Sequence, residues 1–115
     1  MALTPTLKVD DFSSTEALTN KVFEGKPVYS KVFTGTTGSS SDYEVGTVSD
    51  SMADLVNVYG YVKSSNTYIP VGYYNAAVNQ FFCALIYSSK VLGLRYTASS
   101  FANCPFKITV EYTKS

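Results

Sequence analysis

The stretch "CPFKITVEYTKS", at residues 104–115, shows the most regular alternation of apolar and polar residues in the chain. Its apolar members are Phe106, Ile108, Val110 and Tyr112. Neighbouring side chains of a β-strand point to opposite faces of a sheet, so this pattern predicts a strand with one buried apolar face. The other face is expected to meet solvent. Its members are Lys107, Thr109, Glu111 and Thr113.

The same period of two predicts six further strands upstream of this stretch. Their ranges are residues 27–34, 42–48, 53–63, 67–74, 79–87 and 90–97. The segments between them contain Gly, Ser, Asn and Asp, which bond to the local backbone or tolerate a positive φ angle. Short strands at nearly even spacing, without a long helix, predict an all-β fold. We expect an antiparallel β-sandwich of about seven strands, with a barrel as the alternative.

Two of the predicted strands are apolar on both faces, at residues 55–62 and 81–87. Such strands lie in the centre of a sheet, or one of their faces contacts another subunit. A single small sandwich seldom buries two whole strands on both faces. The apolar surplus therefore favours an oligomer.

The N-terminal residues lack this alternation. Ser13 and Glu16 have the spacing of a capping box, in which each side chain bonds the other residue's backbone N–H at a helix start. The run that ends at Asn20 is too short for an independent helix. We therefore expect residues 1–24 to form an arm with one helical turn or irregular structure, and residues 25–115 to form the sandwich.

The composition excludes several classes of function. The chain has 115 residues, enough for one domain with a core, and its nine basic and nine acidic residues cancel. A neutral chain has no overall attraction to nucleic acid or to an anionic membrane. The longest apolar runs are far shorter than a membrane-spanning helix needs. We expect neither a nucleic-acid partner nor membrane insertion, and the start of the sequence shows no signal peptide.

The chain contains no histidine, so the usual general base and the usual metal ligand are missing. Its two cysteines, Cys83 and Cys104, do not form a CxxC motif. We expect two buried thiols, with one disulfide as the alternative. The residues therefore predict no metal, no cofactor and no enzymatic activity.

Two pairs of carboxylates have the residue types that the acid and base of a glycosidase need. They are Asp42 with Glu44, and Asp50 with Asp54. That reaction needs two carboxyl groups at a fixed spacing across a cleft, which the sequence does not show, and we expect these side chains to be solvated. The stretch "GTTGSSSD", at residues 35–42, lacks the Gly-Lys-Ser/Thr ending of a phosphate-binding loop, and we interpret it as a flexible hairpin loop.

A binding site is predicted in "SSNTYIPVGYYN", at residues 64–75. Tyrosine rings beside amide side chains are suited to a sugar, because the ring stacks on its apolar face and the amide bonds its hydroxyls. The candidate residues are Tyr68, Tyr73, Tyr74 and Asn75. The alternative is that these tyrosines pack within the sheets. Arg95 is a further candidate, because a guanidinium binds carboxylates, although an outward strand position without a ligand is the simpler interpretation.

The segment "FSSTEALTNKVFEGKPVYSKVF", at residues 12–33, resembles a segment of the C-terminal modules of bacteriophage tail-fibre and baseplate receptor-binding proteins. The matching residues are Phe12, Ser13, Thr15, Glu16, Gly25, Lys26, Pro27, Val28 and Tyr29. The stretches at residues 55–62, 67–75 and 104–115 are similar to later strands of that family, so the resemblance spans nearly the whole chain. One departure is that Val22 and Phe23 stand in the region where the family usually has a tryptophan.

The resemblance implies a receptor-binding tip in the virion, assembled in the host cytoplasm, that adheres to a bacterial surface glycan or protein receptor. It also implies a homotrimer, whose N-terminal arm contacts other virion proteins. Linked copies would strengthen weak sugar binding. The alternative is a purely structural virion connector, capsid fibre or trimerisation module without a receptor. A glycan-processing enzyme is the weakest alternative, because no catalytic residues are visible.

Overall fold

The strand expected from "CPFKITVEYTKS" is β9 (Pro105–Lys114), and it lies at the centre of the larger of two sheets. The computed structural model describes residues 15–115. The larger sheet has five strands in the order β1-β2-β9-β4-β5. Its other strands are β1 (Ala17–Phe23), β2 (Lys26–Thr36), β4 (Met52–Ser64) and β5 (Thr67–Pro70). Every pairing in it is antiparallel, as predicted.

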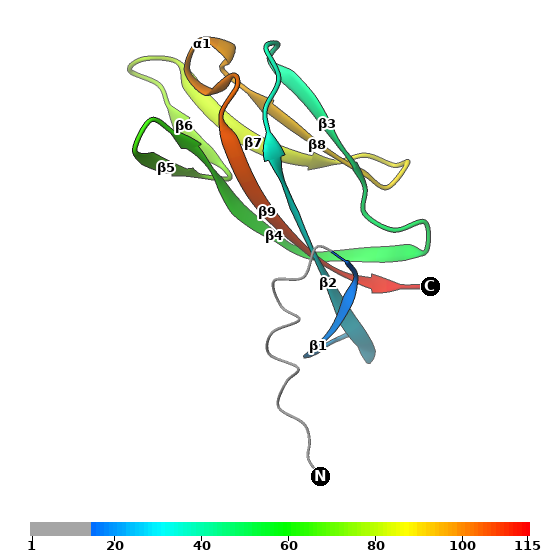
Figure 1. Cartoon of the computed structure of the whole chain (residues 1–115). Coiled ribbons are helices and arrows are strands. Elements are labelled where there is room, and N and C mark those ends of the chain that lie inside the picture. Colours follow the sequence, from blue (N-terminus) through cyan, green and yellow to red (C-terminus); the bar gives the residue numbers. More distant parts are fainter. Residues whose placement is uncertain (1–14) are drawn as a thin grey trace.

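The smaller sheet has four strands in the order β3-β8-β7-β6, also antiparallel, and packs against the larger one (Figure 1). Its strands are β3 (Asp42–Thr47), β6 (Tyr73–Asn75), β7 (Gln80–Ile86) and β8 (Val91–Tyr96). One short helix, α1 (Ala98–Phe101), connects β8 to β9. The predicted antiparallel β-sandwich is confirmed.

The core lies between the two sheets. The larger sheet contributes Val62, Phe106, Ile108, Val110 and Tyr112, and the smaller one contributes Phe82, Leu92, Leu94 and Tyr96. Full burial of one such side chain stabilises the fold by about 1.5–3 kcal/mol. The alternating apolar residues of β9 thus form one wall of this core, as the sequence predicts.

The prediction for the opposite face of β9 was wrong. Thr109 and Glu111 are each only 4% exposed, and Thr113 is fully buried. β9 has a strand on both sides, and neighbouring groups bond its polar side chains. The Lys21 ammonium contacts the Glu111 carboxylate at 2.8 Å, and the Thr113 hydroxyl accepts the N–H of Asp54 at 3.2 Å. A central strand therefore buries polar residues here by giving them partners.

Residues 15–115 form nine strands instead of about seven, and one reason is a change of sheet. The predicted strand at residues 67–74 is divided into β5 and β6 by Val71 and Gly72. The Val71 N–H donates to the Gly60 carbonyl in the larger sheet, and the Gly72 N–H donates to the Phe82 carbonyl in the smaller one. These two residues therefore form the corner at which the chain crosses between the sheets.

The second reason is β1, which occupies residues expected to form a helical turn or an irregular arm. Ser13 of the expected capping box lies outside the described residues. The Glu16 carboxylate accepts hydrogen bonds from Tyr112 at 2.6 Å and from Lys114 at 2.7 Å. The expected boundary between arm and sandwich falls in the turn between β1 and β2, where Glu24 and Gly25 have φ angles of 50° and 81°.

The segment at residues 37–41 connects β2 in the larger sheet to β3 in the smaller one, so it is not a hairpin loop. Thr37 is 2% exposed. Its hydroxyl donates to the Phe101 carbonyl at 2.6 Å and accepts the Cys104 N–H at 2.9 Å. These bonds attach the connection to the segment that precedes β9. Cys83 and Cys104 are free thiols, each partly buried.

Candidate functional site

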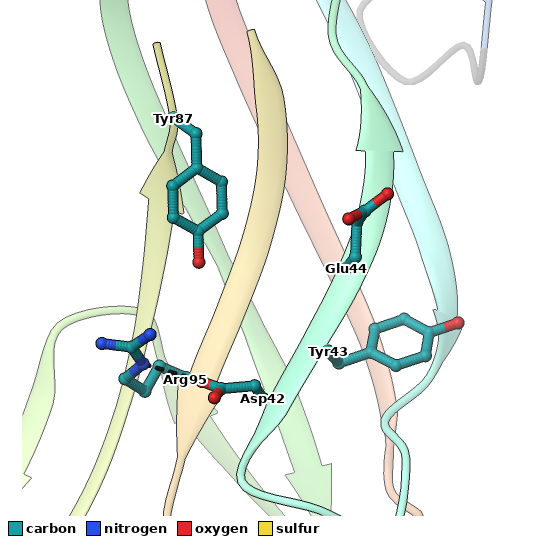
Figure 2. Close-up of a pocket in the computed structure, with 5 residues that line it drawn as sticks. All are labelled: Asp42, Tyr43, Glu44, Tyr87 and Arg95. Carbon is teal, nitrogen blue, oxygen red and sulfur yellow. Dashed lines mark hydrogen bonds and ion pairs between the residues drawn. The ribbon is translucent and has the colours of Figure 1, made fainter. Parts of the chain in front are cut away.

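A pocket of about 270 Å³ lies on the outward face of the smaller sheet (Figure 2). It is lined by Asp42, Tyr43, Glu44, Tyr87 and Arg95. Strands β3 and β8 bring most of these residues together, because Asp42 pairs with Arg95 in the ladder and Glu44 pairs with Gly93. Residues two apart on a strand share a face, so both carboxylates of β3 point outward beside the outward residues of β8.

Tyr87 supplies the aromatic surface of the pocket. It follows β7 and is held in the turn to β8, where its N–H donates to the Val91 carbonyl and its carbonyl accepts the Lys90 N–H. A Cβ at Gly93 would lie 2.8 Å from the Tyr87 ring. The absence of a side chain at Gly93 therefore lets the ring lie close to the sheet. The tyrosine remains 43% exposed, so part of its surface is open to a ligand.

Arg95 and Asp42 form an ion pair across the two strands, with 2.7 Å between Nε and Oδ1. Their side chains are 52% and 60% exposed, and exposed pairs of this kind contribute little to stability. The hydrogen bond to Asp42 raises the pKa of the Arg95 guanidinium, which therefore stays charged. The pair fixes the direction of Arg95 and leaves further N–H groups of its planar fork available as donors.

The two remaining residues of the pocket differ in direction. Figure 2 shows the Glu44 carboxylate on the same strand as Asp42, while the Tyr43 ring points away from Tyr87 and Arg95. Tyr43 packs edge-on against Phe106, with ring centroids 5.8 Å apart. The pocket thus offers one tyrosine surface, one guanidinium and two carboxylates. This set can bond hydroxyl groups and stack on an apolar ring face.

The structure does not bring the four predicted residues of the 64–75 stretch together. Tyr68 is 57% exposed on β5, in the larger sheet. Tyr73 points inward and packs against Phe101, with ring centroids 6.3 Å apart. Tyr74 is 65% exposed on β6, in the smaller sheet. Asn75 accepts the Ala77 N–H through its side-chain oxygen and so supports a turn. Only Arg95 of the predicted site residues lines the pocket.

Sequence reasoning missed Tyr87 and assigned no binding role to Asp42 or Glu44. A signal for the carboxylates was present, because residues two apart on a predicted strand share a face. The glycine in "LGLRY", at residues 92–96, was a second signal, since a glycine within a strand often marks a close approach by another group. The pairing of β3 with β8 was not predictable, because it joins segments far apart in the chain.

Within residues 15–115 no helix is long and apolar enough to cross a membrane. The same residues contain no group of three or more Cys, Asp or Glu side chains placed to hold a metal ion. Comparisons of the chain with protein-family models, with curated proteins and with solved structures find no match.

Proposed function

We propose that the protein is a glycan-binding module and that the pocket between β3, β8 and Tyr87 holds the sugar. The observation that carries this proposal is the position of the Tyr87 ring beside the Arg95–Asp42 pair and Glu44. A pyranose has an apolar C–H face and a rim of hydroxyls. The ring would stack on that face, while the guanidinium and carboxylates would exchange hydrogen bonds with the rim.

The charges of the pocket favour a neutral sugar. Two carboxylates and one guanidinium line it, and the guanidinium already contacts Asp42 at 2.7 Å. An acidic sugar would bring a third carboxylate to this surface, where repulsion would oppose it. An unpaired guanidinium at Arg95 would be suited to the carboxylate of an acidic ligand. Its pairing with Asp42 instead supports hydrogen bonding to hydroxyls.

The resemblance to phage receptor-binding proteins supports a setting for this site. In the proposed setting the chain is the tip of a tail fibre or baseplate protein in the virion, and it binds a bacterial surface glycan without cleaving it. Assembly would take place in the host cytoplasm. The residues before β1 would join the tip to other virion proteins, and three copies would act together.

Exposed apolar residues on β1 and β4 of the larger sheet support the proposed oligomer. Leu18 and Val22 on β1 are 53% and 72% exposed, and Leu55 on β4 is 42% exposed. These residues also favour the second candidate function, a structural virion component without a receptor. The two functions predict the same assembly. They differ in whether the assembled protein binds host cells or their polysaccharides.

The first experiment measures binding of the purified protein to immobilised neutral bacterial polysaccharides and to whole cells of candidate hosts. Tyr87→Ala removes the stacking surface and is expected to lower the affinity about tenfold, because an aromatic contact contributes about 0.5–1.5 kcal/mol beyond area burial. Arg95→Ala is expected to weaken binding similarly. Each variant is first checked for an unchanged melting temperature.

Tyr74→Ala is the matched control, because Tyr74 is an exposed tyrosine of the same sheet that does not line the pocket. It is expected to bind like the wild type. If the Tyr87 and Arg95 variants also bind like the wild type, the pocket is not the receptor site. If the wild-type protein binds neither polysaccharide nor cells, the structural alternative takes its place.

A further inference from the structure

A second pocket, of about 530 Å³, opens between the two sheets at the end of the sandwich that carries α1, opposite β1 (Figure 1). Its volume falls within the range of about 300–1,000 Å³ that is common for ligand sites. The residues that line this polar pocket are Ser64, Ser65, Thr67, Ile69, Gln80, Ser99, Ser100 and Phe101. We propose that the polar pocket binds one ring of a neutral saccharide, as a second site that does not depend on the Tyr87 pocket.

The polar pocket lies where the inward-facing rows of the core change from apolar to polar side chains. Residues two apart on a strand share a face, so Ser64 lies on the inward face of β4 after the buried Val62. In the same way Gln80 lies on the inward face of β7 before the buried Phe82. Thr67 of β5 pairs with Ser64 in the ladder. Polar side chains at these positions keep the gap between the sheets open to solvent, because burying them without partners would be unfavourable.

Hydrogen bonds hold the base of the polar pocket in place across both sheets. The Ser64 hydroxyl donates to the Ser100 carbonyl at 3.0 Å, and the Gln80 amide nitrogen donates to the Ser100 hydroxyl oxygen at 2.7 Å. The helix that carries Ser100 is anchored by Phe101, which is 3% exposed and packs against Phe82 with ring centroids 6.3 Å apart. Because these contacts restrict the polar side chains before a ligand arrives, less conformational entropy is lost on binding.

The lining keeps hydrogen-bonding capacity for a ligand. The Ser100 hydroxyl accepts from Gln80 and still has its own O–H to donate, and the Gln80 side-chain oxygen accepts no hydrogen bond within residues 15–115. At the rim Ser65, Thr67 and Ser99 are exposed, and each hydroxyl can donate one hydrogen bond and accept others. The hydroxyls of a pyranose also donate and accept, so the two sets of groups are complementary.

The charge of the polar pocket favours a neutral ligand. None of the side chains that line it is charged at neutral pH. Lys63 precedes Ser64 but lies on the opposite face of β4, where its ammonium is 5.3 Å from the centroid of the Tyr68 ring. A charged sugar would lose hydration here without meeting an opposite charge. The polar pocket therefore differs from the Tyr87 pocket, which combines an aromatic ring with two carboxylates and one guanidinium.

The test is an NMR titration of the ¹⁵N-labelled protein with the methyl glycosides of glucose, galactose, mannose and N-acetylglucosamine. At least one of these sugars is expected to shift the backbone amides of residues 64–67, 80 and 99–101. The methyl glycoside of the matching uronic acid is expected to shift the same amides much less. Added salt should leave the binding of the neutral sugar unchanged, because no charged group of the protein contacts it.

Two exposed variants at the rim test the contacts directly. Thr67→Val keeps the shape of the side chain and removes its hydroxyl, and Ser99→Ala removes a second hydroxyl. Each is expected to lower the affinity for the neutral sugar about two- to tenfold, the effect of losing one hydrogen bond. Ser39→Ala is the matched control, because it makes the same change at an exposed serine that does not line the polar pocket.

Three results would overturn the proposal. The first is that no glycoside shifts these amides, or that the only amides to shift lie near Tyr87. The second is that the uronic acid shifts the same amides equally, since the uncharged lining then selects nothing. The third is that the Thr67 and Ser99 variants bind like Ser39→Ala. The Tyr87→Ala variant separates this site from the proposed function: it should weaken binding at the Tyr87 pocket and leave the shifts of residues 64–67 unchanged.

Discussion

Gly60 occupies the middle of β4 with a φ angle of 144°, which residues with a Cβ rarely adopt. Its position is tight as well as unusual, because an added Cβ would overlap the Lys107 carbonyl oxygen. Gly46 has a similar φ angle of 152°, yet no atom lies within 4 Å of a Cβ built there. Substituting alanine at each of the two glycines therefore separates the loss of stability due to the backbone angle from the loss due to the clash.

We predict that Gly60→Ala destabilises the protein by about 2–4 kcal/mol, since it combines backbone strain with displacement of β9. Gly46→Ala, the matched control, should lower the free energy of unfolding by about 1 kcal/mol, because it strains the backbone angle without a clash. Urea unfolding followed by circular dichroism measures both values. An equal loss in the two variants would show that the contact between β4 and β9 adjusts without cost.

Adjacent residues show why the predicted candidate residues do not lie together. Tyr73 and Tyr74 have the same side chain, yet one packs in the core against Phe101 and the other is 65% exposed. The period of two predicts that they differ, but it does not say which one faces inward. That choice depends on the partner strand: Tyr73 pairs with the buried Phe82. Side-chain type alone therefore could not locate a binding surface.

Among the elements, three strands bounded by turn residues were predicted nearly to the residue. Predicted ranges 42–48, 53–63 and 90–97 correspond to β3, β4 and β8. The strand that was missed, β1, reads "ALTNKVF" and has no regular alternation, because its exposed residues include Leu18 and Val22. An edge strand is specified by its neighbour more than by its own pattern. The pairing of strands across the sandwich could not be derived from single segments.

The contacts of Glu16 attach the start of β1 to β9, and they give this connection a pH dependence. Burial opposes ionisation of the Glu16 carboxyl, but hydrogen bonds from Lys114 and Tyr112 outweigh it and lower its pKa below the usual 4.5. A carboxyl with a lowered pKa stabilises the folded state while it is ionised. Its contribution is complete above the unfolded pKa and is lost as the pH falls through the folded one.

We predict that the free energy of unfolding falls less steeply below about pH 4.5 in Glu16→Gln than in the wild type, because the variant has no carboxyl to protonate. Urea unfolding at a series of pH values between about 3 and 7 provides the measurement. Glu24→Gln, in the exposed turn between β1 and β2, is the matched control, because it makes the same change of side chain and leaves the hydrogen bonds of Glu16 in place. Identical profiles for all three proteins would mean that these hydrogen bonds do not persist in solution.

At the scale of the whole molecule, one end of the larger sheet carries an apolar row. The cross-strand pairs place Leu18, Tyr29, Tyr112 and Leu55 in register across four strands. The rings of Tyr29 and Tyr112, in the middle of this row, stack with their centroids 6.3 Å apart. Leu18 and Leu55, at its two ends, are 53% and 42% exposed. Exposed apolar residues at both ends of one row are suited to contact with further copies of the chain.

We predict a homotrimer in solution, with a mass near three chains by size-exclusion chromatography with light scattering. The double variant Leu18→Asn/Leu55→Asn should shift the mass toward the monomer, since it places polar groups in the contact. The double variant Tyr68→Asn/Val78→Asn alters exposed residues elsewhere and is the control. A monomeric wild type would remove the oligomer from the proposal and leave the two pockets unaffected.

The central position of β9 has a consequence for how the protein is made. On the ribosome, β1 to β8 are synthesised before residues 105–114, so until then the only native pairings open to the larger sheet are those of two separate hairpins, β1–β2 and β4–β5. Val110 joins them only later, because it pairs with Lys31 on one side and with Val58 on the other. Until then both hairpins hold unpaired strand edges, which are sites of aggregation. The sheet is therefore completed in one late step, and a nascent chain that stalls before β9 lacks the strand that unites it.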